Sequence, residues 1–135
     1  MRYLEDVNRD LMNQRNTILS GAVFGCVAVM LGAFGAHALK EILAATGRVD
    51  TYELAVRYQF YHSLAILLVG LLMGQFSSKF LRYSGLSFCL GIILFSGSLY
   101  VLSFTGKTIL GAVTPFGGLL FILGWVFLML GVHKK

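Results

Sequence analysis

Four long stretches of this chain contain no Asp, Glu, Lys or Arg, and each is long enough to cross a lipid bilayer. They contain 24, 21, 24 and 26 residues and cover residues 16–39, 58–78, 83–106 and 108–133. At a rise of about 1.5 Å per residue, about 20 apolar residues span the hydrocarbon layer. The sequence therefore predicts an all-α integral membrane protein with four transmembrane helices.

The connections between these stretches are short, so we expect one four-helix bundle. Hydrophobic residues make up 57% of the 135 residues and charged residues only 13%, roughly half the charged share of soluble domains. No room remains for an extramembrane domain. We divide the chain into a polar N-terminal segment, residues 1–16, and a transmembrane domain, residues 17–133, with spans near 17–39, 58–78, 83–105 and 110–133.

The basic residues predict the orientation of the bundle. If the helices alternate in direction, seven Lys and Arg fall on the side of both termini: Arg2, Arg9, Arg15, Lys79, Arg82, Lys134 and Lys135. Four fall on the opposite side: Lys40, Arg48, Arg57 and Lys107. Basic residues favour the cytoplasmic side, so both termini are expected there. The charges are scattered between apolar spans, which indicates contacts with membrane lipids and no nucleic-acid partner.

The N-terminal segment differs from the rest of the chain. Leu4, Val7 and Leu11 recur at helical spacing, and polar residues occupy the other faces. This pattern is typical of a short amphipathic helix lying on the membrane surface. A frayed polar tail and a docking segment for a partner are the alternatives.

Two further signals concern helix ends. Asp50 followed by Glu53 resembles a capping box, which predicts a helix starting near Thr51 with Glu53 and Arg57 as an ion pair. Thr114 and Pro115 favour a helix start, with threonine as the N-cap and proline at the first helical position. The alternative is a longer helix from residue 108 that is kinked at Pro115.

Small residues recur at helical intervals within the spans. Lipid provides no hydrophobic force between helices, so association depends on close backbone approach. The glycines expected to pack helices are Gly21, Gly25, Gly32, Gly70, Gly74, Gly117, Gly124 and Gly131. Such glycines pack a bundle internally more often than they form a seam toward a second copy or a partner.

The third span carries hydroxyl groups at Ser96, Ser98, Tyr100 and Ser103. Ser96, Tyr100 and Ser103 are expected to share one face of the helix, with Ser98 beside it. Hydroxyls inside a membrane can hydrogen-bond across helices or line a pore, and the first role is the commoner one.

The candidate polar cluster consists of His37, Glu53, Arg57, Gln59 and His62. His37 ends the first span and His62 begins the second, so an antiparallel hairpin is expected to bring both to the outer membrane boundary. Histidines at an interface usually have a structural role, while a proton-sensing, ligand-sensing or metal-binding role is the alternative. The spacing matches no established metal motif.

No catalytic arrangement is visible, and we expect no enzymatic activity and no cofactor. Cys26 and Cys89 have no CxxC partner and no obvious activating base. The sequence contains no phosphate-binding glycine loop, serine elbow or HExxH motif.

Four blocks taken in order resemble the YgdD-like family of small bacterial membrane proteins, called domain of unknown function 423, which has a eukaryotic relative among the uncharacterised transmembrane proteins. The blocks are LGAFGAHAL at 31–39, YQFYHSLA at 58–65, LFSGSLY at 94–100, and TPFGG at 114–118 followed by Gly124-Trp125. The resemblance implies an integral inner-membrane protein of four helices and carries over no catalytic residue.

These observations favour a non-enzymatic protein that acts through helix contacts, either as a small homo-oligomer or as an accessory subunit bound to another membrane protein. The alternative is a small channel, transporter or sensor in which the polar cluster binds a proton, metal or solute. The central spans contain no Asp, Glu, Lys or Arg, which disfavours ion-coupled transport.

Overall fold

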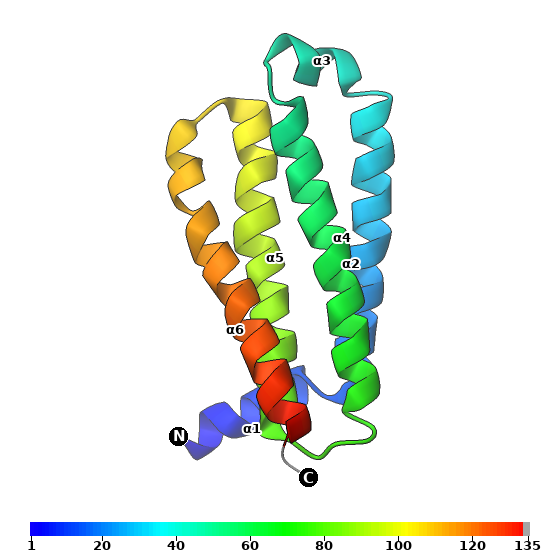
Figure 1. Ribbon diagram of the computed structural model, residues 1–135, viewed down its shortest axis with the longest axis vertical. Coiled ribbons are helices and arrows are strands. Elements are labelled where there is room, and N and C mark those ends of the chain that lie inside the picture. Colours follow the sequence, from blue (N-terminus) through cyan, green and yellow to red (C-terminus); the bar gives the residue numbers. More distant parts are fainter. Residues whose placement is uncertain (134–135) are drawn as a thin grey trace.

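The computed structural model describes residues 1–133, which fold into helices joined by short turns (Figure 1). In chain order these are α1 (Arg2–Leu11), α2 (Gln14–Ala36), α3 (Lys40–Ala45), α4 (Val49–Leu72), α5 (Lys79–Thr105), the 3-10 helix η1 (Thr108–Ala112) and α6 (Thr114–His133). Within residues 1–133, four segments are long and apolar enough to span a membrane: α2, α4, α5, and η1 together with α6. The predicted all-α fold with four transmembrane helices is confirmed.

The four long helices follow one another in the order α2, α4, α5, α6 across the view of Figure 1, an arrangement called the row below. Each packs most closely on its neighbours in this row, and the backbones of α4 and α6 lie further apart, with side chains such as His62 and Phe121 meeting between them. Helix α2 has no comparable contact with α5 or α6. Consequently α2 and α6 each have one main helical neighbour and expose their outer faces.

Local sequence signals explain several helix ends. Asn13 caps α2 by accepting a hydrogen bond from the Asn16 backbone N–H at 2.9 Å, and Ser78 caps α5 in the same way through Phe80. Helix α5 stops at Gly106, which has φ of +67°. Glycine adopts this left-handed conformation without a steric penalty, so it ends the helix at low cost.

The expected starts of α4 and α6 lie within two residues of the observed ones, but the expected side-chain caps do not form. Helix α4 starts at Val49, two residues before Thr51, and the residue before it, Arg48, makes no side-chain cap. Helix α6 starts at Thr114, whose hydroxyl lies 2.8 Å from the Ser98 hydroxyl and 3.4 Å from the Leu110 carbonyl instead of capping the helix. The short helix α3 was not predicted; its Leu43 is fully buried, so tertiary packing stabilises it.

The N-terminal segment forms a helix rather than a frayed tail. Helix α1 crosses the end of the bundle near the start of α5 (Figure 1). Met12 follows α1 and is only 5% exposed. Its terminal methyl fills the space beside Gly85, where an added Cβ would lie 2.8 Å away. Met12 therefore fastens the N-terminal segment onto α5.

Glycines allow the closest helix contacts. Each of the eight glycines expected to pack helices has an atom of another helix of this chain within 4 Å of where a Cβ would stand. In the α2–α4 pair, Gly21 faces Leu67 and Gly70 faces Ile18. The α5–α6 pair is tighter still, because a Cβ on Gly117 would lie 2.4 Å from the backbone nitrogen of Phe95. These glycines thus serve contacts within the chain.

Candidate functional site

The interior of the row is held by hydrogen bonds that centre on Gln59. Its amide nitrogen donates to the Phe24 carbonyl of α2 at 2.9 Å, and its amide oxygen accepts from the Tyr100 hydroxyl of α5 at 2.8 Å. Gln59 is only 3% exposed. One side chain of α4 therefore ties three helices together in an environment where an unpaired polar group is costly.

Other interior hydroxyls also donate to carbonyls of neighbouring helices. Ser96 donates to Ala55 of α4 at 2.7 Å, and Ser84 donates to Gly124 of α6 at 2.8 Å. Ser98 pairs with Thr114 at the start of α6, whereas Ser103 bonds to Leu99 within its own helix. Ser96 and Tyr100 therefore both reach α4, whereas Ser98, which was expected beside their face, reaches α6.

His62 lies near the middle of α4 and faces α5 and α6. Its ring stacks on Phe121 with centroids 3.6 Å apart and an interplanar angle of 6°. Its Nδ1 lies 2.8 Å from the Tyr58 carbonyl oxygen, and its Nε2 lies 3.4 Å from the indole Nε1 of Trp125. Both ring nitrogens thus have partners, and the imidazole acts as a packing residue between helices.

These partners predict the tautomer of His62. A carbonyl oxygen can only accept, so Nδ1 carries the proton, while Nε2 accepts from the indole N–H. We expect ¹⁵N spectra of the histidine-labelled protein to show a neutral Nδ1–H ring at His62. Trp125→Phe should perturb the Nε2 resonance and leave Nδ1 protonated. A neutral ring protonated at Nε2 would contradict this assignment.

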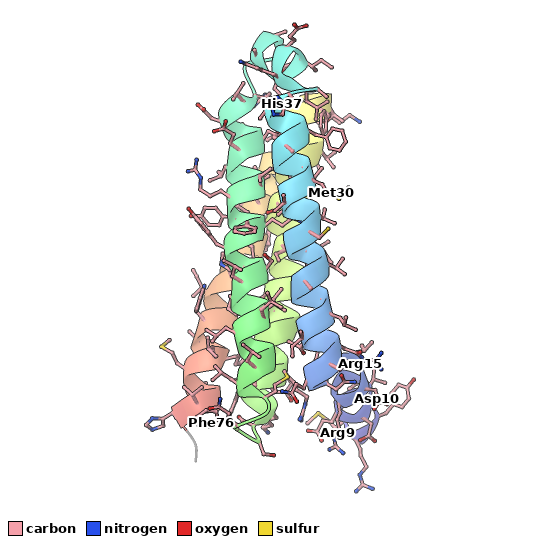
Figure 2. All side chains as sticks on the ribbon, turned by 90° about the vertical axis from the view of Figure 1, so that its right-hand side faces the viewer. Arg9, Asp10, Arg15, Met30, His37 and Phe76 are labelled. Atoms are coloured by element: carbon pink, nitrogen blue, oxygen red, sulfur yellow. The ribbon has the colours of Figure 1, made fainter. Side chains whose placement is uncertain are left out.

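The five residues of the predicted polar cluster do not form one site. His37 is exposed at the end of α2 (Figure 2). His62 lies 13 residues beyond Val49, the first residue of α4, which is about 20 Å along the helix. The expectation that both histidines meet at one membrane boundary is therefore wrong, because α4 begins well before the charge-free stretch and carries His62 to mid-depth.

Glu53 and Arg57 remain together near the end of the row that carries α3. They line a cavity of about 260 Å³ between α2, α3 and α4. Gly32, Gly35 and Tyr52 also line this cavity. The Tyr52 hydroxyl donates to the Leu31 carbonyl at 2.6 Å. The predicted ion pair is absent, since within the described residues Glu53 and Arg57 make no salt bridge with each other.

A second hollow lies between α4 and α6. It measures about 600 Å³ and is lined by Tyr58, His62, Phe95, Phe121 and Trp125, with further apolar residues of α6. The ring of Tyr58 stacks on Phe95 with centroids 4.7 Å apart. Over residues 1–133, no three His, Cys, Asp or Glu side chains come close enough to hold a metal ion.

The fold and its interior define a class: a small polytopic helical membrane protein in which buried polar side chains bond one helix to the next. The chain belongs to the family described as "Protein of unknown function (DUF423)", whose sequence profile matches residues 31–118. This range runs from within α2 to the start of α6. The resemblance drawn from the four sequence blocks is confirmed.

Relatives share most of their length with this chain. A UPF0382 membrane protein of Staphylococcus saprophyticus is 44% identical over 117 residues, which is 87% of this chain and 96% of the relative. A UPF0382 membrane protein of Haemophilus influenzae is 40% identical over 93% of this chain and 98% of its own. The UPF0382 inner membrane protein YgdD of Escherichia coli is 36% identical over 91% and 93%. No solved structure matches significantly.

Several residues that shape the interior were not singled out from the sequence. Ser84, Tyr52 and Trp125 each bond to a neighbouring helix through a partner far away in the chain. The available signal was their residue type, because buried Tyr and Trp usually find a partner for their polar atom. The partner itself depends on how the helices are rotated.

Proposed function

We propose that the protein is a non-enzymatic accessory subunit of the bacterial inner membrane, which acts by binding a transmembrane helix of another membrane protein. The inner-membrane location follows the Escherichia coli relative, which is named an inner membrane protein. The family provides no catalytic residue to transfer, and the interior polar groups described above are engaged in holding helices together.

The observation that carries this proposal is an apolar groove between α2 and α5. The groove measures about 350 Å³ and exists because α2 packs on α4 and leaves α5 uncovered. Its walls include Val27 and Leu31 of α2 and Ile93 and Gly97 of α5. A Cβ on Gly97 would meet nothing within 4 Å, unlike the glycines that pack the row.

The space beside Gly97 is unoccupied, and the groove faces lipid. A helix of another protein can therefore approach closely at this glycine. Small residues let helix backbones come close enough for dispersion and weak hydrogen bonds to hold them, which is the main attraction available in lipid. The space beside the packing glycines of α2, α4 and α6 is already occupied by other residues of this chain. A separate helix of a partner is therefore favoured over a homo-oligomer built on those glycines.

The orientation that we propose places both termini in the cytoplasm. The end of the row that carries α1 holds Arg2, Arg9, Arg15, Lys79 and Arg82, and the sequence adds Lys134 and Lys135 after α6. The other end holds Lys40, Arg48, Arg57 and Lys107. The side richer in basic residues is the cytoplasmic one in most inner-membrane proteins.

The proposal that a partner helix binds in this groove can be tested by filling the groove with a larger side chain. We expect the protein purified from native membranes in mild detergent to carry a membrane protein in fixed ratio, and Gly97→Leu to reduce that ratio at least about tenfold by removing close approach. Gly111→Leu is the matched control, since Gly111 also has nothing within 4 Å but lies in η1, outside the groove.

The measurement is quantitative mass spectrometry of the purified complex, with the thermal midpoint of each variant recorded alongside. Equal loss of the partner in both variants, or a partner ratio that Gly97→Leu leaves unchanged, would contradict the proposal that the partner binds in the groove. A complex containing only copies of this chain would contradict the accessory role and favour the homo-oligomer. The polar-cluster alternative is not favoured, because only Glu53 and Arg57 share a cavity, while His37 is exposed at the end of α2 and Gln59 and His62 pack between helices.

A further inference from the structure

A polar pocket lies at the end of the row where α1 crosses. It measures about 190 Å³ and is formed by the end of α1, the start of α2, the α4–α5 turn and the first turn of α5. Its polar lining consists of Arg9, Asn13, Gln14, Ser77, Ser78 and Arg82. Figure 2 shows Arg9 and Phe76, another lining residue, at the same end of the molecule.

Two arginines share this pocket without an acid between them. No Asp or Glu is among the described residues that line it, and neither Arg9 nor Arg82 forms a salt bridge with any described residue, Asp10 included. The Nε of Arg82 is buried and has no hydrogen-bond partner. A buried N–H donor without a partner is costly, and two cations in one small pocket repel each other.

Two helix N-termini add to the positive potential. Asn13 is the N-cap of α2 and Ser78 is the N-cap of α5, and both line the pocket. These helices are 23 and 27 residues long. The backbone N–H groups at a helix start carry partial positive charge and favour an anion.

We infer that this pocket binds a phosphate group, carried either by a phospholipid headgroup or by free inorganic phosphate. The planar guanidinium of arginine matches the oxygens of phosphate and can donate two parallel hydrogen bonds. A bound phosphate supplies the negative charge that the lining lacks and offsets the repulsion between the two arginines. Met12 lines the same pocket and fastens the α1 segment to α5, which keeps Arg9 near Arg82.

Binding can be measured on the full chain in dodecyl maltoside, a detergent without phosphate. After delipidation, we expect inorganic phosphate or dihexanoyl phosphatidylglycerol to raise the thermal midpoint above that in chloride of equal ionic strength, since a ligand that binds only the folded state stabilises it. Arg82→Gln should weaken the binding of either probe about tenfold or more through loss of charge-assisted hydrogen bonds. Arg9→Gln should weaken it in the same direction.

Arg15→Gln is the matched control, because Arg15 is exposed at the same end and does not line the pocket. It should leave binding nearly unchanged. Stabilisation by both probes identifies a phosphate site open to either source, and stabilisation by the lipid alone identifies a headgroup site. The inference is overturned if neither probe stabilises the wild-type protein beyond chloride, or if Arg15→Gln loses as much affinity as Arg82→Gln. This inference is independent of the α2–α5 groove and of any partner.

Discussion

Gly117→Ala is expected to destabilise the protein by about 2–3 kcal/mol, which is a large effect for one added methyl group. The new Cβ would stand 2.4 Å from the backbone nitrogen and 2.7 Å from the Cα of Phe95. Backbone atoms of a buried helix cannot rotate away as a side chain can. Helix α6 must therefore move off α5 and lose contacts along much of its length.

Gly118→Ala is the control for this variant. It lies one residue further along α6, and the nearest atom to its added Cβ is 4.0 Å away. Alanine is favoured over glycine in a helix by up to about 1 kcal/mol, so this change should be neutral or stabilising. Unfolding in detergent can be followed by the fluorescence of Trp125, the single tryptophan of the chain, which lies in α6. Equal stability of the two variants would show that α6 does not lie this close to α5.

Gln59→Leu is expected to cost about 1–2 kcal/mol and to loosen α2 from the row. Leucine has a similar size, so the loss comes from hydrogen bonds rather than from a cavity. The change removes the bond to the Phe24 carbonyl and leaves the Tyr100 hydroxyl without its partner. Hydrogen exchange measured by mass spectrometry should show faster exchange in α2 than in α6.

Ser103→Ala is the matched control for the loss of a buried polar group. Ser103 is fully buried, but its hydroxyl bonds only to Leu99 in its own helix, so its removal should cost less than about 0.5 kcal/mol. A double-mutant cycle of Gln59→Leu with Tyr100→Phe isolates the bond between the two side chains. Additive effects in that cycle, or uniform exchange across all helices, would argue against the network.

The outcome for the glycines illustrates how far sequence alone reaches. Regular spacing identifies Gly117, Gly124 and Gly131 as residues for close helix packing, and all three lie against α5. Spacing does not reveal that Gly117 meets backbone while Gly124 meets the ring of Phe88. The expected cost of a substitution depends on that difference, since a ring can shift and a helix backbone cannot.

The histidines illustrate where sequence reasoning fails. His37 and His62 are both close to the ends of charge-free stretches, which suggested equal depth. Arg57 bounds the second stretch but does not end α4, which continues past it to Val49, near the predicted start, and Glu53 and Arg57 line a cavity near the end of the row. Helix α4 therefore extends toward α3, and His62 lies at mid-depth beside Phe121. Charge marks the polar boundary of a span and gives little information on where a helix begins.

The sequence by itself determined that this chain spans a membrane with four helices, because the length and apolarity of each stretch are properties of contiguous residues. It also determined the family, through short blocks read in order. Only the tertiary structure decided which helices are neighbours in the row, the groove beside Gly97 and the pocket that Arg9 and Arg82 both line, because these depend on how each helix is rotated and which neighbour it packs against. In lipid the helices are apolar on all sides, so the hydrophobic pattern that would reveal the inner face of a soluble helix is missing.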